Sequence, residues 1–343
     1  MVPVLILSGF LGSGKTTLLL RLIQEAQERN LRVGILMNEL GRQDIDGRIV
    51  QESFDSSIAK LLDGCVCCTR KSELAGSIGT LLADKPDLLL LELTGVANPE
   101  EVAEALTDSS LLGRVRIKQI VTVLDAEHLL DYNSVFASDR ELVDTLRSQV
   151  AVADVLVLNK TDLVSSARMP KLEKAIRKLN EKAPLLPATR CAIELSPFFE
   201  GLAPAGYEKS LPVGRGRPLV RVKAAGTSVL ELAQEYGSEA SVRDLPRATT
   251  HSRLVTFTLE WPERVALSPT ALIGFLKRWG TGLLRAKGYL PHPREGIRLL
   301  QYAGGRAEWS QVADGTPSPL VLITLDLEEA DVREEWERLI ATG

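Results

Sequence analysis

Residues 9–16 read GFLGSGKT and fit the pattern G-x-x-x-x-G-K-[ST] of a phosphate-binding loop. The apolar run Val4–Leu7 precedes this loop and a helical pattern beginning near Thr16 follows it, which is the context that the motif requires. Backbone N–H groups of such a loop, together with those at the start of the following helix, form an anion site. We therefore predict a phosphate site, in preference to a glycine-rich turn that only joins a strand to a helix.

The side chains of this loop have separate expected roles. Lys15 is predicted to reach the β and γ oxygens of a nucleoside triphosphate. The Thr16 hydroxyl is predicted to ligate Mg²⁺, because that ion prefers oxygen donors and keeps few protein ligands. The full set of predicted phosphate-binding residues is Gly9, Gly12, Ser13, Gly14, Lys15, Thr16 and Thr17.

A second motif, Asn159-Lys160-Thr161-Asp162, follows the apolar run Val155–Leu158. It is therefore expected in a loop at the carboxyl edge of a sheet, where α/β proteins bind ligands. The Asp162 carboxylate can accept hydrogen bonds from N1–H and N2–H₂ of guanine, whereas adenine lacks this donor pair. The stem of Lys160 is expected to lie over the base. The alternative makes Asn159 a turn residue and Asp162 a helix cap; we favour GTP over ATP.

An acidic residue, Glu92, ends the apolar run Leu88–Leu91. We expect Glu92 to hold Mg²⁺ directly or through water, and the Gly95 amide to contact a γ-phosphate, so that GTP orders this loop. The simpler alternative is that Glu92 only terminates a strand. The predicted catalytic residues are Lys15, Thr16 and Glu92. No obvious Gln or His stands where an attacking water would be oriented, so the hydrolytic residue is left open.

Another acidic stretch follows the apolar run Val33–Met37 and is a candidate switch segment. It begins with Asn38-Glu39-Leu40-Gly41 and continues through Asp44, Asp46 and Gly47.

Three of the chain's four cysteines lie in one short stretch, at Cys65, Cys67 and Cys68. Thiolates favour Zn²⁺ and similar transition metals, and three sulfurs leave a tetrahedral site one ligand short. That arrangement suits metal exchange better than a permanent structural site. Glu39 or a histidine such as His251 is a candidate fourth ligand, and the sequence does not choose between them. The alternatives are cysteines packed as small apolar residues and a redox switch.

Composition excludes several classes of protein. The 343 residues carry 41 Lys and Arg against 45 Asp and Glu, a net charge of −4, which argues against an extended nucleic-acid surface. Four Cys and three His argue against a disulfide-rich secreted scaffold. The apolar runs are too short to span a membrane, and Met1–Leu7 lacks a basic leader. We expect a cytoplasmic protein with no nucleic-acid or membrane partner, in which the isolated Cys191 is a buried small residue.

These candidate residues require an α/β fold to position them. Short apolar runs alternate with helical patterns as far as about Ala188, and continuous apolar runs are typical of parallel strands covered on both faces. The helix starting near Thr16 has a stop signal at Asn30. The predicted strands are Val4–Leu7, Val33–Met37, Leu88–Leu91, Ile120–Leu124 and Val155–Leu158.

The order of elements changes in the C-terminal part. We predict a strand at Leu254–Leu259, a helix around Pro269–Trp279, a hairpin turning at Gly304-Gly305 and a terminal helix over Leu327–Ala341. The predicted organisation is an α/β P-loop domain at 1–196, with a mostly parallel sheet flanked by helices. A Gly- and Pro-rich linker or bridging segment follows at 197–250, and a small α+β domain at 251–343.

Taken in order, the stretches GFLGSGKTT, NELG, GCVCCT, ELTGVANP and NKTD resemble the CobW-type GTPases, a branch of the SIMIBI class of P-loop proteins associated with metal trafficking. Leu284–Gly288 and Gln301 resemble that family's C-terminal domain. The resemblance implies that Gly12–Thr17 bind phosphates and Mg²⁺, that the NKTD motif binds guanine, and that the three clustered cysteines bind a transition metal.

The chain departs from the family pattern in two places. It has Leu40 and Arg42 where many members read Asn-Glu-Phe-Gly-Glu, which removes an acidic candidate ligand. It also lacks a His-rich tract, having only His128, His251 and His292.

The leading hypothesis is a GTP-hydrolysing metallochaperone that uses GTP/GDP, Mg²⁺ and Zn²⁺ or Co²⁺ and delivers the transition metal to a client metalloprotein or chelatase. One alternative is a nucleotide-switched scaffold or activator for metalloenzyme assembly, and a further one is a nucleotide kinase. The C-terminal domain is expected to choose the partner. A homodimer is left open, as are the choice of metal and the identity of the client.

Overall fold

The computed structural model describes residues 1–38, 57–61, 69–95, 97–108, 110–133, 140–204, 252–261, 267–293, 295–311 and 317–342. Several residues singled out by the sequence lie outside these ranges, namely Glu39, Leu40, Arg42, Asp44, Asp46, Cys65, Cys67, Cys68 and His251. The predicted bridging segment 197–250 is described only as far as position 204. The domain boundaries expected from the sequence therefore remain predictions.

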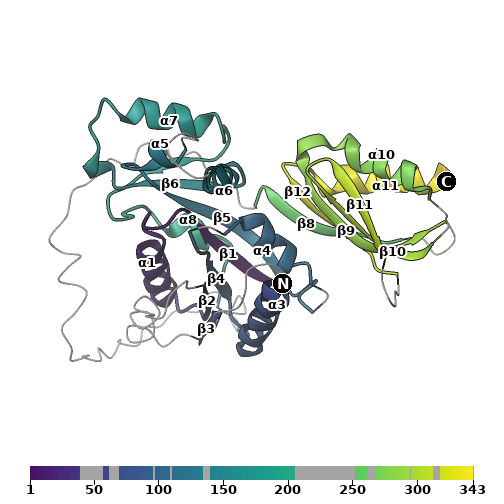
Figure 1. Ribbon diagram of the computed structural model, residues 1–343. Coiled ribbons are helices and arrows are strands. Elements are labelled where there is room, and N and C mark those ends of the chain that lie inside the picture. The colour runs from purple at the N-terminus through teal and green to yellow at the C-terminus, as the bar shows by residue number, and fades with distance from the viewer. Residues whose placement is uncertain are drawn as a thin grey trace.

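A seven-stranded parallel sheet forms the first part of the described chain, in the order β3-β2-β4-β1-β5-β6-β7 (Figure 1). Every residue of β4 and β6 is buried, because helices cover both faces of the sheet. The strands are β1 (Val2–Ser8), β2 (Val33–Asn38), β3 (Ser57–Leu61), β4 (Leu88–Glu92), β5 (Val115–Asp125), β6 (Val155–Asn159) and β7 (Leu185–Pro187). The predicted class, a parallel sheet flanked by helices, is confirmed.

Helices join these strands by crossovers. The α-helices of this part are α1 (Lys15–Glu28), α3 (Thr69–Leu81), α4 (Pro99–Ala105), α5 (Leu129–Tyr132), α6 (Arg140–Ala151), α7 (Met169–Arg177) and α8 (Ser196–Phe199). Short 3₁₀ turns occur at η1 (Leu82–Asp84) and η2 (Thr161–Leu163). The predicted end of the first helix is also confirmed, because Asn30 adopts the left-handed conformation with φ 57° just beyond α1.

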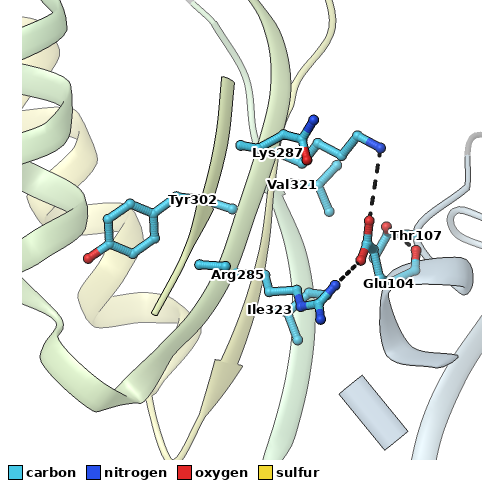
Figure 2. Close-up of a pocket in the computed structure, with 10 residues that line it drawn as sticks. Glu104, Thr107, Arg285, Lys287, Tyr302, Val321 and Ile323 are labelled. Carbon is cyan, nitrogen blue, oxygen red and sulfur yellow. Dashed lines mark hydrogen bonds and ion pairs between the residues drawn. The ribbon is translucent and has the colours of Figure 1, made fainter. Parts of the chain in front are cut away.

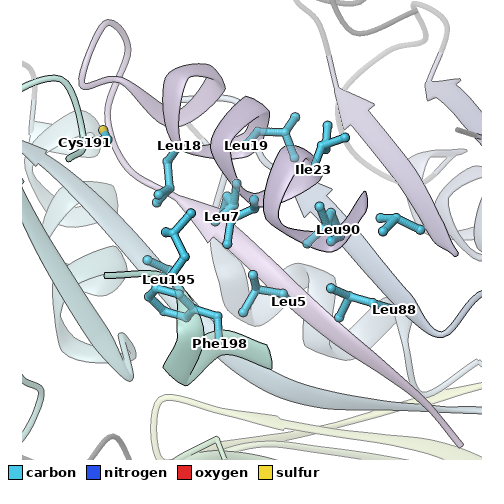
Figure 3. Packing of buried hydrophobic residues seen from close by; sticks show 14 of the residues in the cluster. Leu5, Leu7, Leu18, Leu19, Ile23, Leu88, Leu90, Cys191, Leu195 and Phe198 are labelled. Carbon is cyan, nitrogen blue, oxygen red and sulfur yellow. The ribbon is translucent and has the colours of Figure 1, made fainter. Parts of the chain in front are cut away.

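Alternate residues of β1 face opposite layers, as the period of a strand requires. Leu5 and Leu7 pack with Leu18 and Leu19 of α1 in one buried cluster (Figure 3). Val4 and Ile6 belong to the other cluster, which includes residues of α3 and α4. The central strand is therefore apolar on both faces, which explains the continuous apolar run in its sequence.

One predicted strand boundary is wrong. β5 begins at Val115 rather than at Ile120. Lys118 lies at a register shift in the pairing with β1, and its ammonium donates to the Glu200 carbonyl at 2.7 Å. Because this contact satisfies the buried ammonium, the polar stretch remains part of the strand. Helix α8 crosses position 197, where the predicted linker begins, and the domain boundary itself stays a prediction. Phe198 and Phe199 of α8 are buried in the same cluster as α1.

The sequence analysis missed two edge strands, β3 and β7. The five residues of β3, SIAKL, form a short and partly polar run. The three residues of β7 include a proline. Both strands lie at the edges of the sheet, and each is hydrogen-bonded to one parallel strand on one side only.

The C-terminal part forms a separate antiparallel sheet in the order β11-β10-β9-β12-β8. Its elements are β8 (Leu254–Leu259), α10 (Pro269–Arg278), η3 (Gly280–Gly282), β9 (Leu283–His292), β10 (Gly296–Ala303), β11 (Arg306–Gln311), β12 (Leu320–Leu325) and α11 (Glu329–Thr342). Trp336 of α11 and Phe275 of α10 pack in the core of this sheet, with ring centroids 5.4 Å apart. The predicted α+β domain and the hairpin at Gly304-Gly305 are confirmed.

The two sheets meet at a polar junction before β8. The Asp154 carboxylate, which is 1% exposed, accepts hydrogen bonds from the Ser252 hydroxyl and from the backbone N–H groups of Ile120 and Arg253, at 2.6–2.7 Å. Burial raises the pKa of Asp154 to about 6, although these hydrogen bonds oppose that shift. The Arg253 guanidinium pairs with Asp326 at 2.7 Å. The start of β8 is thus attached to the first sheet.

Among the described residues, no helix combines the length and the apolar character that crossing a membrane would need.

Candidate nucleotide-binding site

The loop between β1 and α1 leaves no space for side chains at two of its glycines. Gly9 has φ 132°, and a Cβ there would lie 2.1 Å from the Val123 carbonyl oxygen. Gly14 has φ 110°, and a Cβ there would lie 2.5 Å from Nδ2 of Asn159. Gly14 is also the N-cap of α1, and no side chain among the described residues caps this helix. The first N–H groups of α1 therefore point toward the loop, as an anion site requires.

Three polar residues in this loop and just after β4 are buried, namely Ser13, Lys15 and Thr94. Lys15 is 7% exposed, and its Nζ donates to the Phe10 carbonyl at 3.1 Å, which holds the ammonium over the loop. The hydroxyls of Ser13 and Thr94 are buried and have no hydrogen-bond partner within the described part of the chain. Buried hydroxyls normally have one. Phosphate oxygens would satisfy these donors.

The two residues predicted to hold Mg²⁺ lie together. The Thr16 hydroxyl donates to Oε1 of Glu92 at 2.9 Å, joining the first turn of α1 to the end of β4. The parallel register brings this about, because Glu92 is opposite Leu7, the penultimate residue of β1. A hydroxyl and a carboxylate at this distance suit a hard cation that also binds phosphate.

The backbone of Gly95 packs against the P-loop. A Cβ at Gly95 would lie 2.4 Å from the Leu11 nitrogen, so only glycine fits here. On its other side, the Gly95 carbonyl accepts a hydrogen bond from Nε2 of Gln149 at 3.3 Å. The structure thus brings the predicted γ-phosphate sensor next to the predicted phosphate loop. The sequence does not reveal the role of Gln149, because one glutamine in an amphipathic helix carries no signal of its partner.

Asn159 links the two predicted motifs through its own side chain. Its Nδ2 donates to the Ser13 carbonyl at 2.8 Å, and its Oδ1 accepts from the Cys191 amide at 2.8 Å. The side chain is 3% exposed at the end of β6. Asn159 therefore fixes the phosphate loop against the segment that carries the predicted base-recognition residues.

Lys160 and Asp162 are presented differently. Lys160 has φ 61°, and its Nζ donates to Oδ2 of Asp125 at 2.7 Å. Burial alone would raise the pKa of Asp125, but hydrogen bonds involving Lys160, His128 and the Glu127 amide hold that pKa below its usual value. The Asp125 carboxylate therefore stays ionised and orients the Lys160 stem. The sequence analysis did not single out Asp125, although a carboxylate that ends a buried strand was the available signal.

Asp162 is exposed and lies inside η2. The residue at the N-cap position of η2 is Lys160, so the alternative in which Asp162 caps a helix is wrong. An exposed carboxylate beside Lys160 is accessible to a base.

Cys191 is a buried small residue, as predicted. It is 0% exposed, and its Sγ lies 3.4 Å from the Gly14 carbonyl oxygen. Burial raises the pKa of its thiol to about 11, so the thiol stays protonated at neutral pH. The clustered cysteines and Glu39 lie outside the described residues, so the transition-metal site predicted from them stays a prediction.

The described residues contain one group of three metal-ligating side chains, Asp125, Glu127 and His128, whose ligand atoms lie within 4.8 Å of one another. The Lys160 ammonium already contacts Asp125 at 2.7 Å, so a positive charge occupies this position. We assign this group to the orientation of Lys160.

Comparison with known families identifies both parts of the chain. Residues 3–187 match the family described as CobW/HypB/UreG, nucleotide-binding domain. Residues 257–340 match the family described as Cobalamin synthesis protein cobW C-terminal domain. The first match covers the phosphate loop, Glu92 and the Asn159–Asp162 motif, which are the segments that form the site above.

Individual proteins resemble the chain over different lengths. The zinc chaperone CobW of Sinorhizobium sp is 27% identical, over 99% of this chain and 97% of that protein. Zinc-regulated GTPase metalloprotein activator 1 of Dictyostelium discoideum is 31% identical, over 57% of this chain, and the chain spans only 47% of that protein's length. The crystal structure of Zn(II)-bound YjiA GTPase from E. coli aligns over 98% of both chains, with 21% identity and a TM-score of 0.44.

Proposed function

We propose, because this chain belongs to the family of CobW/HypB/UreG nucleotide-binding domains, that it binds and hydrolyses GTP and uses this cycle to carry a transition metal. The observation that supports the nucleotide site best is the hydrogen bond of 2.9 Å between Thr16 and Glu92. It joins the end of the phosphate loop to the acidic end of β4, as a site for a metal-bound triphosphate requires.

In this proposal the phosphates lie in the P-loop, against the start of α1. Lys15 contacts the β and γ oxygens, and the buried hydroxyls of Ser13 and Thr94 supply further donors. Thr16 and Glu92 hold Mg²⁺, which when bound would neutralise negative charge on the β- and γ-phosphates. Hydrolysis joins a water oxygen to the γ-phosphorus, breaks the bond from that phosphorus to the β–γ bridging oxygen, and leaves GDP and inorganic phosphate.

Guanine recognition rests on Asp162 and Lys160. The exposed Asp162 carboxylate accepts from N1–H and N2–H₂ of guanine, a pair of donors that adenine does not have. Lys160 lies over the base, since Asp125 holds its ammonium at 2.7 Å. Asn159 keeps this end of the site in register with the phosphate loop.

The transition metal binds Cys65, Cys67 and Cys68 in this proposal, with Glu39 as a candidate fourth ligand. The support is the chemistry of clustered thiolates, which favour Zn²⁺ and Co²⁺. Two relatives are named as a zinc chaperone and a zinc-regulated metalloprotein activator, which favours zinc. An incomplete set of protein ligands allows transfer to a client metalloprotein in the cytoplasm.

The metal assignment has a direct test. We expect protein purified with a non-hydrolysable GTP analogue to bind about one zinc ion per chain, and Cys67→Ala to lose that ion. Cys191→Ala is the matched control, because Cys191 is buried against Gly14 and away from solvent. Metal analysis and competition titration measure both variants. Cys67→Ala protein that binds zinc as the unmodified chain does would refute the cysteine site.

A further inference from the structure

The loop between β4 and α4 is held from two sides. On one side, Gly95 packs so closely on the P-loop that a Cβ would lie 2.4 Å from the Leu11 nitrogen. On the other side, Nε2 of Gln149 donates to the carbonyls of Gly95 and Ala97, at 3.3 and 2.9 Å. Gln149 is fully buried on α6. A displacement of this loop must therefore break or stretch both of these hydrogen bonds.

Helix α4 begins immediately after this loop. The Asn98 side chain caps it by accepting from the Glu100 amide at 3.0 Å. The Ser148 hydroxyl, next to Gln149 on α6, lies 3.2 Å from both the Asn98 Oδ1 and the Glu100 Oε1. The seven residues of α4 are about 10 Å long at the rise of an α-helix. So short a helix moves as one body with the loop that precedes it.

The other end of α4 contacts the C-terminal domain. Glu104 forms ion pairs with Arg285 and with Lys287, both on β9 (Figure 2). Arg285 also lies 3.9 Å from Glu100, one turn earlier on the same helix. The side chains of Glu104 and Arg285 are only 14% and 28% exposed, so solvent screens this pair less than it screens a surface pair.

Apolar contacts and a small cavity surround these charges. Val102 and Leu106 share a buried cluster with Leu254 of β8 and Ile323 of β12. A cavity of about 60 Å³ lies beside Glu104, between α4 and the outer face of the C-terminal sheet. The junction is therefore packed on its apolar side and has free space on its charged side, which is where a small movement of Glu104 is accommodated.

We propose that α4 couples the nucleotide site to the C-terminal domain. A change of the loop after Glu92 on nucleotide exchange shifts the contacts with Gln149, moves α4, and alters the ion pairs of Glu104 with Arg285 and Lys287. This regulation rests on the proposed GTP cycle. Coupling between two sites is reciprocal. Removing the ion pair between Arg285 and Glu104, far from the phosphates, must therefore change how strongly the chain prefers GTP over GDP.

The test compares Arg285→Ala, Glu104→Gln and the double variant. Fluorescence titration with a non-hydrolysable GTP analogue and with GDP gives the ratio of the two dissociation constants for each protein. We expect each single variant to change that ratio by about five-fold, within the range found for residues that couple sites. The double variant should change the ratio by less than the product of the two single effects, since both substitutions remove the shared contact between Glu104 and Arg285.

A control and a second measurement make the outcome decisive. Arg278→Ala removes an exposed ion pair with Glu335 inside the C-terminal domain and should leave the ratio unchanged. Hydrogen exchange of the β9 amides should differ between the GTP-analogue and GDP states in the unmodified chain, and this difference should vanish in Glu104→Gln. Circular dichroism establishes that each variant is folded.

The failures of the two proposals are distinguishable. Suppose that the unmodified chain prefers one of the two nucleotides, and that Arg285→Ala and Glu104→Gln keep the ratio of dissociation constants within two-fold and keep the hydrogen-exchange pattern of the β9 amides. The coupling is then refuted, and the GTP cycle stands. If the unmodified chain binds neither nucleotide, the proposed function is refuted and the coupling with it.

Discussion

Asp154 links stability to pH at the junction of the two sheets. Its carboxylate is 1% exposed, and burial raises its pKa from 3.8 to about 6. Between pH 3.8 and about pH 6, the Asp154 carboxyl group is therefore protonated more often in the folded chain than in the unfolded chain. Stability from Asp154 is therefore present at low pH and is lost as pH rises toward 6. The whole shift corresponds to about 3 kcal/mol at 1.36 kcal/mol per pKa unit.

The substitution Asp154→Asn removes this titration. Linkage predicts that the unmodified chain gains about 2 kcal/mol over the variant when pH falls from 7.5 to 4.5, because the folded carboxyl is then protonated. The variant should also be less stable at every pH, since one amide oxygen cannot replace the two carboxylate oxygens that accept from Ile120, Ser252 and Arg253.

Urea unfolding followed by circular dichroism at pH 4.5, 5.5, 6.5 and 7.5 measures this difference directly. The variant is compared with the unmodified chain at each pH, so that titration of all other groups cancels. A stability difference between the two proteins that stays constant across this pH range would refute the reasoning, because Asp154 would then have the same pKa in both states.

Three further predictions concern the nucleotide site. Glu92→Gln keeps the contact with Thr16 but removes the charge, so the rate of GTP hydrolysis should fall by roughly 10²-fold. An assay of phosphate release measures this rate. As a control, Glu101→Gln on the exposed face of α4 should hydrolyse GTP as the unmodified chain does. Gly9→Ala places a Cβ 2.1 Å from a carbonyl of β5 and should lower the thermal midpoint sharply. Gly113→Ala, at φ 72° and with open space around the new Cβ, should lose only about 1 kcal/mol; equal losses would contradict the steric argument. Asp162→Asn should weaken GTP binding about 10²-fold, because the amide keeps one acceptor oxygen and sets an N–H₂ donor against a donor of guanine. The same donor should favour xanthosine triphosphate, as competition titration can determine; unchanged GTP selectivity would remove the role given to Asp162.

Most of the central sheet was predictable from the sequence, and its edges were not. The runs Val33–Met37, Leu88–Leu91 and Val155–Leu158 are continuous and apolar because both faces of each strand are covered, and all three lie within observed strands. β5 begins earlier than predicted because a bulge and a distant carbonyl accommodate the buried Lys118. No local pattern reveals such compensation.

The sequence by itself determined the phosphate loop, because its residues are contiguous and their chemistry follows from backbone geometry. The motif itself specifies glycine at positions 9 and 14, and Lys15 and Thr16 follow at fixed positions. The strand ends at Glu92 and Asn159 were likewise readable, since parallel strands bring their carboxyl ends to one edge.

Only the tertiary structure decided which of these residues touch and what orients them. Asn159 reaches Ser13 across 146 positions, Lys160 reaches Asp125, and Glu104 reaches Arg285 across 181 positions. Helical and strand periodicity shows that a side chain faces inward or outward, but it contains no information about which distant residue it meets. The parallel alignment of the strands brings the first two pairs together at one edge of the sheet. The contact of α4 with β9 makes the third pair, and with it the proposed link between the nucleotide site and the C-terminal domain.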